Sequence, residues 1–333
     1  MQDSQVSAYI NEFKGNLFEF LVAKQLATET NLDKQFVQDI APEFHLQLMN
    51  YETQLRKQAP ELLSQLPLMA QDLTKLLKEK IRGKIKNIYL IGKVNTTGQN
   101  NQWKEADILV EAEKMHPISL KLSKEAAFVN TKSAGLKSFF TQYFSSFKQA
   151  QRMQIELNIF IEREFEILSQ NLHLHAGLNY PGHYGLWKEA GYSELPGQLG
   201  QDQKMILHDY YSKITQKIFD FMKQLQQENV EAFFQALLPL MGFGHMDMIQ
   251  ATCFYDKNIF RIELDELKDF LIYNNNCLLK KSEKKLSSFE IVFNTLTLQI
   301  RVKPMNKFTS ESYKVNCSIK RNYDTFLSST TSH

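Results

Sequence analysis

The sequence predicts an α/β protein of the α+β type, in which a mixed central sheet is flanked by helices. Three observations predict this class. Apolar residues in the first 80 positions recur at helical spacing, three short apolar runs between residues 85 and 123 have strand character, and the end of the chain alternates apolar and polar residues. We therefore expect a helical N-terminal part, a central sheet and a β-rich C-terminal part.

Residues 4–80 are predicted to be helical. A first apolar series runs through Tyr9, Phe13, Leu17, Phe20, Leu21 and Leu26. A second series runs through Leu62, Leu63, Leu66, Met69, Leu73, Leu76 and Leu77. Steps of three and four residues place such side chains on one helix face, and Pro67 marks a point where the second helix would kink or split.

The central part of the chain predicts strands followed by a helix. Val, Ile and Leu dominate three short runs, at residues 85–94, 106–112 and 117–123. Residues 95–101 have the composition of a turn. A helix with aromatic anchors is expected from Ser133 to Phe147. This order of elements suggests that the strands form one mixed sheet with helices on its faces.

The second half of the chain begins with helices and ends with strands. Residues 150–170 and 203–242 are predicted to be helical. Between them, residues 171–200 form a long loop rich in Gly, His and aromatic residues, a type that is usually functional when ordered. Strands are expected from Phe289 to Asn294, from Thr297 to Val302 and from Tyr313 to Lys320, since these segments largely alternate.

We divide the chain into three regions on this basis. Residues 1–150 would hold a helical arm and the central sheet. Residues 151–247 would form a helical region that contains the 171–200 loop. Residues 248–333 would form a β-rich basic part, because lysines crowd residues 280–285 and several cations follow Arg301.

The composition is that of an ordinary soluble globular protein, with 43% hydrophobic and 23% charged residues and a net charge of +2. The three cysteines lie far apart, which fits a reducing compartment and argues against a zinc site. The polar N-terminus does not resemble a signal peptide, and no apolar run reaches the length of about 18 residues that a membrane span needs. We expect a cytoplasmic protein with no membrane association.

Asp107 and Lys121 are charged residues within predicted buried strands. An unpaired buried charge is very costly, so Lys121 needs a charged partner or a wet cleft. Only the residues from Glu113 to Pro117 separate the two strands, which predicts a hairpin with the two side chains side by side. Ser119 faces the same side as Lys121. The alternative is that Asp107 caps a strand and Lys121 extends to solvent.

An acid and a lysine that converge in this way suit a divalent metal, its water and a phosphate. Asp107 would supply a metal-binding carboxylate, and the Leu120 carbonyl would point its oxygen at the same ion. Lys121 would position or deprotonate the attacking water and stabilise charge on the phosphate.

Over about residues 10–145, this pattern resembles the PD-(D/E)XK nuclease superfamily, the fold of many restriction and repair nucleases. That family has an acid on one strand and an acid-x-Lys on the next. Asp107 matches the first acid and Lys121 the lysine, whereas Ser119 stands where the family usually has Asp or Glu. Members with a polar residue there sometimes recruit a carboxylate from the first helix, and Glu19 is the candidate here.

The resemblance implies a restriction-endonuclease-like core and a Mg²⁺-dependent endonuclease of the type II restriction kind, which hydrolyses phosphodiester bonds in double-stranded DNA. Mg²⁺, which Mn²⁺ would replace, would bind through Asp107, Glu19 and the Leu120 carbonyl, while Lys121 and Ser119 complete the catalytic set. A homodimer is plausible because two strands need two sites. The Ser119 departure leaves an alternative, a non-catalytic nucleic-acid-binding protein on the same fold.

Two basic groups are candidate DNA contacts. Lys132 and Lys137 lie at a predicted helix N-terminus, where a backbone phosphate would bind. Arg301 and Lys303 share one strand face, and Lys314 lies on a later strand. The alternatives are an ordinary capped helix start and a solvated outer sheet face.

The histidines of the 171–200 loop are weaker candidates. His173 and His175 alternate as on a strand, which would make them a metal pair, although no third ligand is evident. Lone histidines of this kind are more often structural than catalytic.

Overall fold

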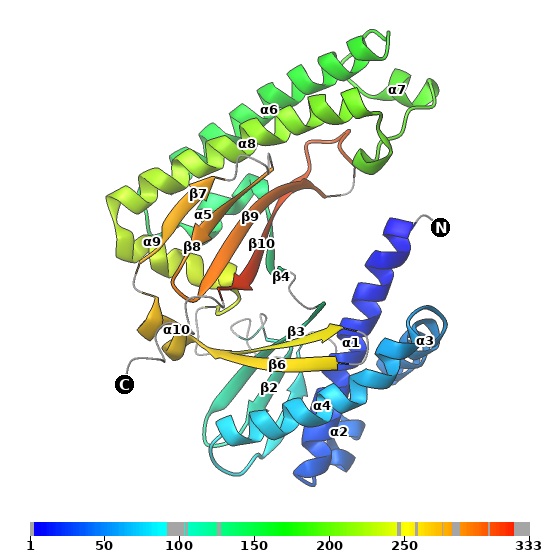
Figure 1. The fold of residues 1–333 in the computed structure, drawn as a ribbon, viewed down its shortest axis with the longest axis vertical. Coiled ribbons are helices and arrows are strands. Elements are labelled where there is room, and N and C mark those ends of the chain that lie inside the picture. The colour runs from blue at the N-terminus through cyan, green and yellow to red at the C-terminus, as the bar shows by residue number, and fades with distance from the viewer. Residues whose placement is uncertain are drawn as a thin grey trace. The chain divides into compact units, whose positions relative to one another are not determined.

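The structure, a computed structural model, describes residues 3–91, 103, 106–124, 128–244, 248–256, 259–274, 276–281, 287–305 and 307–322. Its chain forms two compact units (Figure 1). Unit 1 comprises residues 1–129 and 242–272, and unit 2 comprises residues 130–241 and 273–333. The predicted α+β class is confirmed, with a helical N-terminal part and a β-rich C-terminal part. The units therefore divide the chain at residues 129, 241 and 272.

Unit 1 begins with a layer of four helices. These are α1 (Asp3–Glu29), α2 (Asp33–Gln38), α3 (Pro42–Gln58) and α4 (Pro60–Lys80). Pro42 and Pro60 each occupy the first turn of a helix, where the missing N–H of proline is not needed. Pro67 lies inside α4, and the helix continues through it to Lys80. None of the helices in the described residues is long and apolar enough to cross a membrane.

The helices of unit 1 cover one face of a five-stranded sheet, the first sheet. Its strands lie in the order β1 (Asn87–Leu90), β2 (Ile108–Glu111), β3 (Met115–Lys124), β5 (Ile249–Asp256) and β6 (Ile259–Glu266). Neighbouring strands run antiparallel except β3 and β5, which are parallel. Buried residues of β1, β2, β3 and β5 join those of α1 to α4 in one hydrophobic cluster. The mixed sheet and the β2–β3 hairpin were both expected from the sequence.

Unit 2 contains the second sheet and is built from two segments of the chain. Residues 130–241 are inserted between β3 and β5, the two parallel strands of the first sheet, and residues 273–333 follow unit 1. The strands of the second sheet lie in the order β4 (Val129–Gly135), β10 (Tyr313–Arg321), β9 (Leu296–Pro304), β8 (Ser288–Val292) and β7 (Leu278–Lys281). Two long helices, α6 (Ala150–His175) and α8 (Gln201–Glu228), pack against each other (Figure 1). Ring contacts of Phe165 and Tyr210 with Tyr313 join these helices to the buried face of β10.

The remaining elements of both units are short. Unit 2 contains α5 (Phe139–Tyr143), α7 (Gly185–Glu189), α9 (Val230–Leu237) and the 3₁₀ turns Leu136–Ser138, Pro196–Gln198 and Leu238–Met241. The helix α10 (Leu267–Tyr273) follows β6, at the boundary between the units.

The predicted helix from Ser133 to Phe147 is wrong in its first part. Val129–Gly135 is the edge strand β4, which pairs with β10 from the far end of the chain. Thr131 donates a hydrogen bond to the Cys317 carbonyl, and Ser133 donates one to the Asn316 side chain. Helix begins only at Phe139. A pairing with a strand this distant leaves no trace in the local pattern, and tertiary context overrides local propensity.

Candidate functional site

The face of the first sheet opposite the helices carries a group of polar side chains. We call it the polar face, and it consists of Asp107, Ser119, Lys121, Gln250, Thr252, Glu263 and Asp265. Side chains alternate along a strand, so the residues between these, such as Leu120 and Ala251, point into the hydrophobic cluster. The strand register aligns the polar residues in two rows. Ser119 lies beside Gln250 and then Asp265, and Lys121 lies beside Thr252 and then Glu263.

Asp107 stands at the start of β2, where its backbone is fixed from both sides. Its N–H donates to the Ile118 carbonyl at 2.8 Å, and its carbonyl accepts from the Ile91 N–H at 3.0 Å. Its carboxylate turns toward β3. The oxygen Oδ2 accepts a 2.6 Å hydrogen bond from the Leu120 N–H and a 3.2 Å bond from the Ser119 hydroxyl. Asp107 Oδ1 makes no hydrogen bond within the described part of the chain, so it is available to a further group.

Lys121 points at the same carboxylate. Its Nζ lies 3.6 Å from Asp107 Oδ2, and the two side chains are 22% and 25% exposed. The ammonium therefore lies at the acid, not out in bulk solvent, while water and small solutes can reach the pair. A lysine and an aspartate that are held together and partly exposed suit the binding of a phosphate together with a cation.

Leu120 contributes through its backbone. In an extended strand, the N–H and C=O groups of one residue point toward the same neighbouring strand. Because the Leu120 N–H bonds the Asp107 carboxylate, its carbonyl oxygen also lies on the β2 side of the strand. This oxygen and Asp107 Oδ1 are the two acceptors that the β2–β3 junction offers to a bound cation.

Glu19 is not joined to this pair. It is half-buried on α1, and α1 packs on the apolar side of the sheet through neighbours such as Phe18 and Val22. Asp107 and Lys121 make no hydrogen bond or ion pair with it. Across the described residues, no group of three or more His, Cys, Asp or Glu side chains is arranged to hold a metal ion.

The donor set at Asp107 consists only of oxygen atoms, which are the ligands that Mg²⁺ prefers. Mg²⁺ usually keeps several waters and takes only one or two protein carboxylates. One carboxylate and one carbonyl therefore fit a largely hydrated Mg²⁺, without the third ligand expected from Glu19. Gln250 and Thr252 were not among the predicted site residues. Their alternation with Ile249, Ala251 and Cys253 is the sequence signal that marks a strand with one polar face.

The predicted 171–200 loop folds around an aromatic cluster. Trp187 is fully buried, and its ring lies 5.5 Å from that of His173 and 4.6 Å from that of Tyr192. His173 and His175 belong to α6, so the strand-like alternation predicted for them is wrong. Residues two apart on a helix point in different directions. His173 is buried with Nδ1 2.8 Å from the Ser169 carbonyl, which is a structural role.

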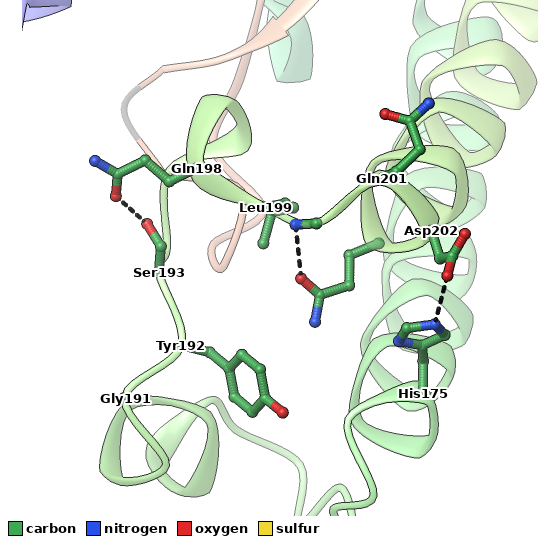
Figure 2. A pocket seen from close by; sticks show the side chains of 10 residues that line it. His175, Gly191, Tyr192, Ser193, Gln198, Leu199, Gln201 and Asp202 are labelled. Carbon is green, nitrogen blue, oxygen red and sulfur yellow. Dashed lines mark hydrogen bonds and ion pairs between the residues drawn. The ribbon is translucent and has the colours of Figure 1, made fainter.

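A pocket of about 570 Å³ lies beside this cluster, at the N-terminus of α8 (Figure 2). Its wall includes Tyr192, Gln198 and the pair formed by His175 Nε2 and Asp202 Oδ2, which are 3.6 Å apart. The side chains of His175 and Asp202 are 42% and 76% exposed. A weakly held, solvated pair of this kind gives no activated nucleophile, so we do not assign chemistry to this pocket.

The predicted DNA contacts lie in unit 2. Arg301, Lys303 and Lys314 are on β9 and β10, and alternate with the buried residues of those strands. Lys303 and Lys314 are directly opposite each other. Burial lowers the pKa of the Lys303 ammonium, and the charges of Arg301 and Lys314 lower it further. We call this outward face the basic face, and none of the three cations makes an ion pair in the described residues.

Lys132 and Lys137 have other surroundings than expected. Lys132 lies on β4, and Lys137 lies in the single 3₁₀ turn that follows it. The helix N-terminus predicted to bind a phosphate there is therefore absent. Lys137 Nζ is 3.3 Å from Glu311 Oε2, so part of its charge is already balanced.

No model of a known protein family matches the chain, and no curated protein matches its sequence.

Proposed function

We propose that this chain is a metal-dependent DNA endonuclease whose active site is the polar face of the first sheet. One observation carries the proposal. At the junction of β2 and β3, a single carboxylate oxygen of Asp107 contacts the Leu120 N–H, the Ser119 hydroxyl and the Lys121 ammonium. This is the acid and lysine pair expected from the resemblance to the PD-(D/E)XK nucleases, held on adjacent strands and partly open to solvent.

Each residue of the proposed active site would have a separate role. Mg²⁺, when bound, supplies a Lewis acid that activates water and offsets charge on the phosphate. Asp107 Oδ1 and the Leu120 carbonyl would hold it. Ser119 and the Leu120 N–H keep the carboxylate in one orientation, so little reorganisation is needed during the reaction. Lys121 would position the attacking water and neutralise the negative charge that grows on the phosphate oxygens.

The basic face supports DNA as the substrate. Its unpaired cations face outward from β9 and β10 and repel one another, and a row of phosphates would relieve that repulsion. We propose that Arg301, Lys303 and Lys314 contact the DNA backbone, with Lys132 and Lys137 as further contacts. Cleavage of both strands at one site would need two copies of the chain, so we propose a homodimer as the active form.

The sparse metal ligands favour a second candidate, a nucleic-acid-binding protein that does not cleave. Ser119 in place of an acid leaves Asp107 as the carboxylate that contacts Lys121, and the described residues contain no group of three or more His, Cys, Asp or Glu arranged to hold a metal ion. This candidate predicts salt-dependent DNA binding without binding of Mg²⁺ or Mn²⁺ at Asp107.

The deciding experiment is incubation of the purified full chain with unmethylated plasmids of varied sequence, with Mg²⁺, with Mn²⁺ and with EDTA. We expect nicked or linear product with either metal and none with EDTA, and no product from a folded Asp107→Asn variant. Intact plasmid under all conditions, with the wild-type protein folded and bound to the DNA, would replace the endonuclease by the second candidate. Light scattering with and without DNA tests the dimer.

A further inference from the structure

Gln250 has a buried amide without a hydrogen bond to any described residue. It lies on β5 and is 0% exposed, and within the part of the chain that the structure describes neither its Oε1 nor its Nε2 makes a hydrogen bond. Amides inside proteins are almost always hydrogen-bonded, so each exception asks for an explanation such as a water, an ion or a functional role. The β5 backbone is fixed on both sides by β3 and β6, so the side chain is kept where it is by the sheet itself.

The position of Gln250 points to the proposed active site. It is the partner of Ser119 in the parallel β3–β5 pairing, and the Ser119 hydroxyl donates to Asp107. Neighbouring residues of paired strands face the same side of a sheet. Asp107, Ser119 and Gln250 therefore form one row over three adjacent strands, with a short side chain in the middle and a longer polar one on each flank.

Ser119 stands where an acid is expected, and it is too short to fill that place. The side chain of Gln250 has one more methylene group than that of Ser119 and ends in an amide, so it is long enough to extend over the neighbouring strand toward the space above Ser119. Amide carbonyl oxygens are accepted ligands of hard divalent cations. The row thus offers a second side-chain oxygen at the position where the carboxylate is missing.

We propose that Gln250 is a metal-binding residue of the active site, whose Oε1 is an oxygen ligand of the divalent cation held at Asp107. This inference rests on the proposed function, and it adds a residue from the strand that follows the inserted residues 130–241. On this proposal, the partner of the Gln250 amide oxygen is the bound cation, which explains why the amide makes no hydrogen bond to the described residues.

The chain offers a matched control in Gln65. Gln65 is also buried, at 6% exposure, and both of its amide atoms also lack hydrogen bonds. It lies on α4, among the residues that pack on the apolar side of the sheet. Replacing either glutamine by leucine removes an amide from a similarly buried position. Gln250 lies near the proposed site, and Gln65 lies away from it.

The test is Mn²⁺ binding to the full-length chain by isothermal titration calorimetry, together with thermal unfolding, for Gln250→Leu, Gln250→Glu and Gln65→Leu. We expect Gln250→Leu to weaken Mn²⁺ binding by about 10- to 100-fold without lowering the melting temperature, since an unsatisfied polar group is replaced by an apolar one. Gln250→Glu should bind Mn²⁺ more tightly than wild type. Gln65→Leu should bind it as wild type does.

Two results would overturn the assignment while leaving the nuclease proposal intact. One is unchanged Mn²⁺ affinity in folded Gln250→Leu while Asp107→Asn loses binding. The other, decisive if Gln250→Leu fails to fold, is Gln250→Glu binding no more tightly than wild type. Failure of the wild-type protein to bind Mn²⁺ or to cleave DNA would instead remove the proposed function, and this inference with it.

Discussion

Asp107 Oδ2 is the atom at which the contacts of the proposed site converge. Three donors from consecutive residues of β3 meet at it, and the nearest is a backbone N–H at 2.6 Å. A backbone donor cannot rotate away, so the carboxylate stays in one orientation whether or not Lys121 is engaged. Lys121, at 3.6 Å, is the loosest of the three contacts and is therefore free to move toward a substrate.

Replacing Lys121 separates its chemistry from its packing. Lys121→Met keeps the length of the side chain and removes the charge, so we expect cleavage to fall by roughly 10²- to 10³-fold. Melting temperature and DNA affinity should change little, because the ammonium would act mainly on charge that develops in the transition state. Single-turnover cleavage assays with Mg²⁺ measure the effect.

Lys124 is the control for this substitution, since it is exposed at the end of the same strand. Lys124→Met should cleave as wild type does. Undiminished cleavage by Lys121→Met would show that the site assignment is wrong, even in a protein that proved to be a nuclease.

The interactions of Glu194 are expected to make the stability of unit 2 sensitive to acid. Burial alone would raise its pKa, but hydrogen bonds from Lys307 and Thr309 and an ion pair with Lys188 outweigh burial and lower the pKa from 4.5 to about 2. A carboxyl whose pKa is depressed by folding stabilises the protein above its unfolded pKa. That contribution is lost as the pH falls from about 4.5 to about 2.

We therefore expect Glu194→Gln to be less stable than wild type at pH 7, with a difference that shrinks below pH 4.5. Urea unfolding followed by Trp187 fluorescence at pH 7 and pH 3 measures it. Glu189→Gln, at an exposed position on α7, should show no such convergence. A difference between Glu194→Gln and wild type that is the same at both pH values would contradict the assignment.

At the scale of the element, the β9–β10 pair places like charges directly opposite each other. Lys303 and Lys314 are cross-strand partners, and such pairs destabilise a sheet. Lys303→Met should leave the fold as stable or more stable. It should also weaken DNA binding and reduce the slope of log affinity against log salt concentration by roughly 0.9, the value for one lost phosphate contact.

Fluorescence anisotropy with a labelled duplex at several salt concentrations gives that slope. The control is Lys75→Met, since Lys75 lies on α4 and pairs with Asp72 at 2.8 Å. An unaltered slope in Lys303→Met would remove the basic face from the DNA interface and leave it as a solvated sheet surface.

The elements that could be predicted from the sequence are those whose partners are near in the chain. The β2–β3 hairpin is of this kind, because Asp107 and Lys121 are joined by one short turn. The edge strand β4 could not be predicted, since it exists only through its pairing with β10. Gln250 was not predicted as a site residue for the same reason. Its position beside Ser119 depends on the pairing of β3 with β5, two strands that are far apart in the sequence.

At the scale of the whole molecule, each unit has a core of its own. The hydrophobic cluster that joins the first sheet to α1–α4 contains no residue of unit 2. Unit 2 has separate buried residues, among them Leu298 on β9 and Trp187. Large domains with separate cores commonly unfold in more than one step.

We therefore expect a core substitution to act within its own unit. Leu73→Ala removes a fully buried side chain from the cluster of unit 1 and should cost that unit about 2–5 kcal/mol. The unfolding of unit 2, followed by Trp187 fluorescence in a Trp103→Phe background, should not move. Leu298→Ala should shift the Trp187 signal. Equal shifts of that signal by both substitutions would show that the units unfold together.

The insertion of residues 130–241 between β3 and β5 also has a consequence during synthesis of the chain. The β5 edge of β3 has no partner until residues 249–256 leave the ribosome, which at usual rates of translation takes roughly ten seconds. An open edge strand is a template for aggregation, and lysine within such a strand is one of the devices that prevents it. Lys121 lies in the middle of this temporary edge. The charge proposed to serve catalysis in the finished protein would first protect the nascent chain.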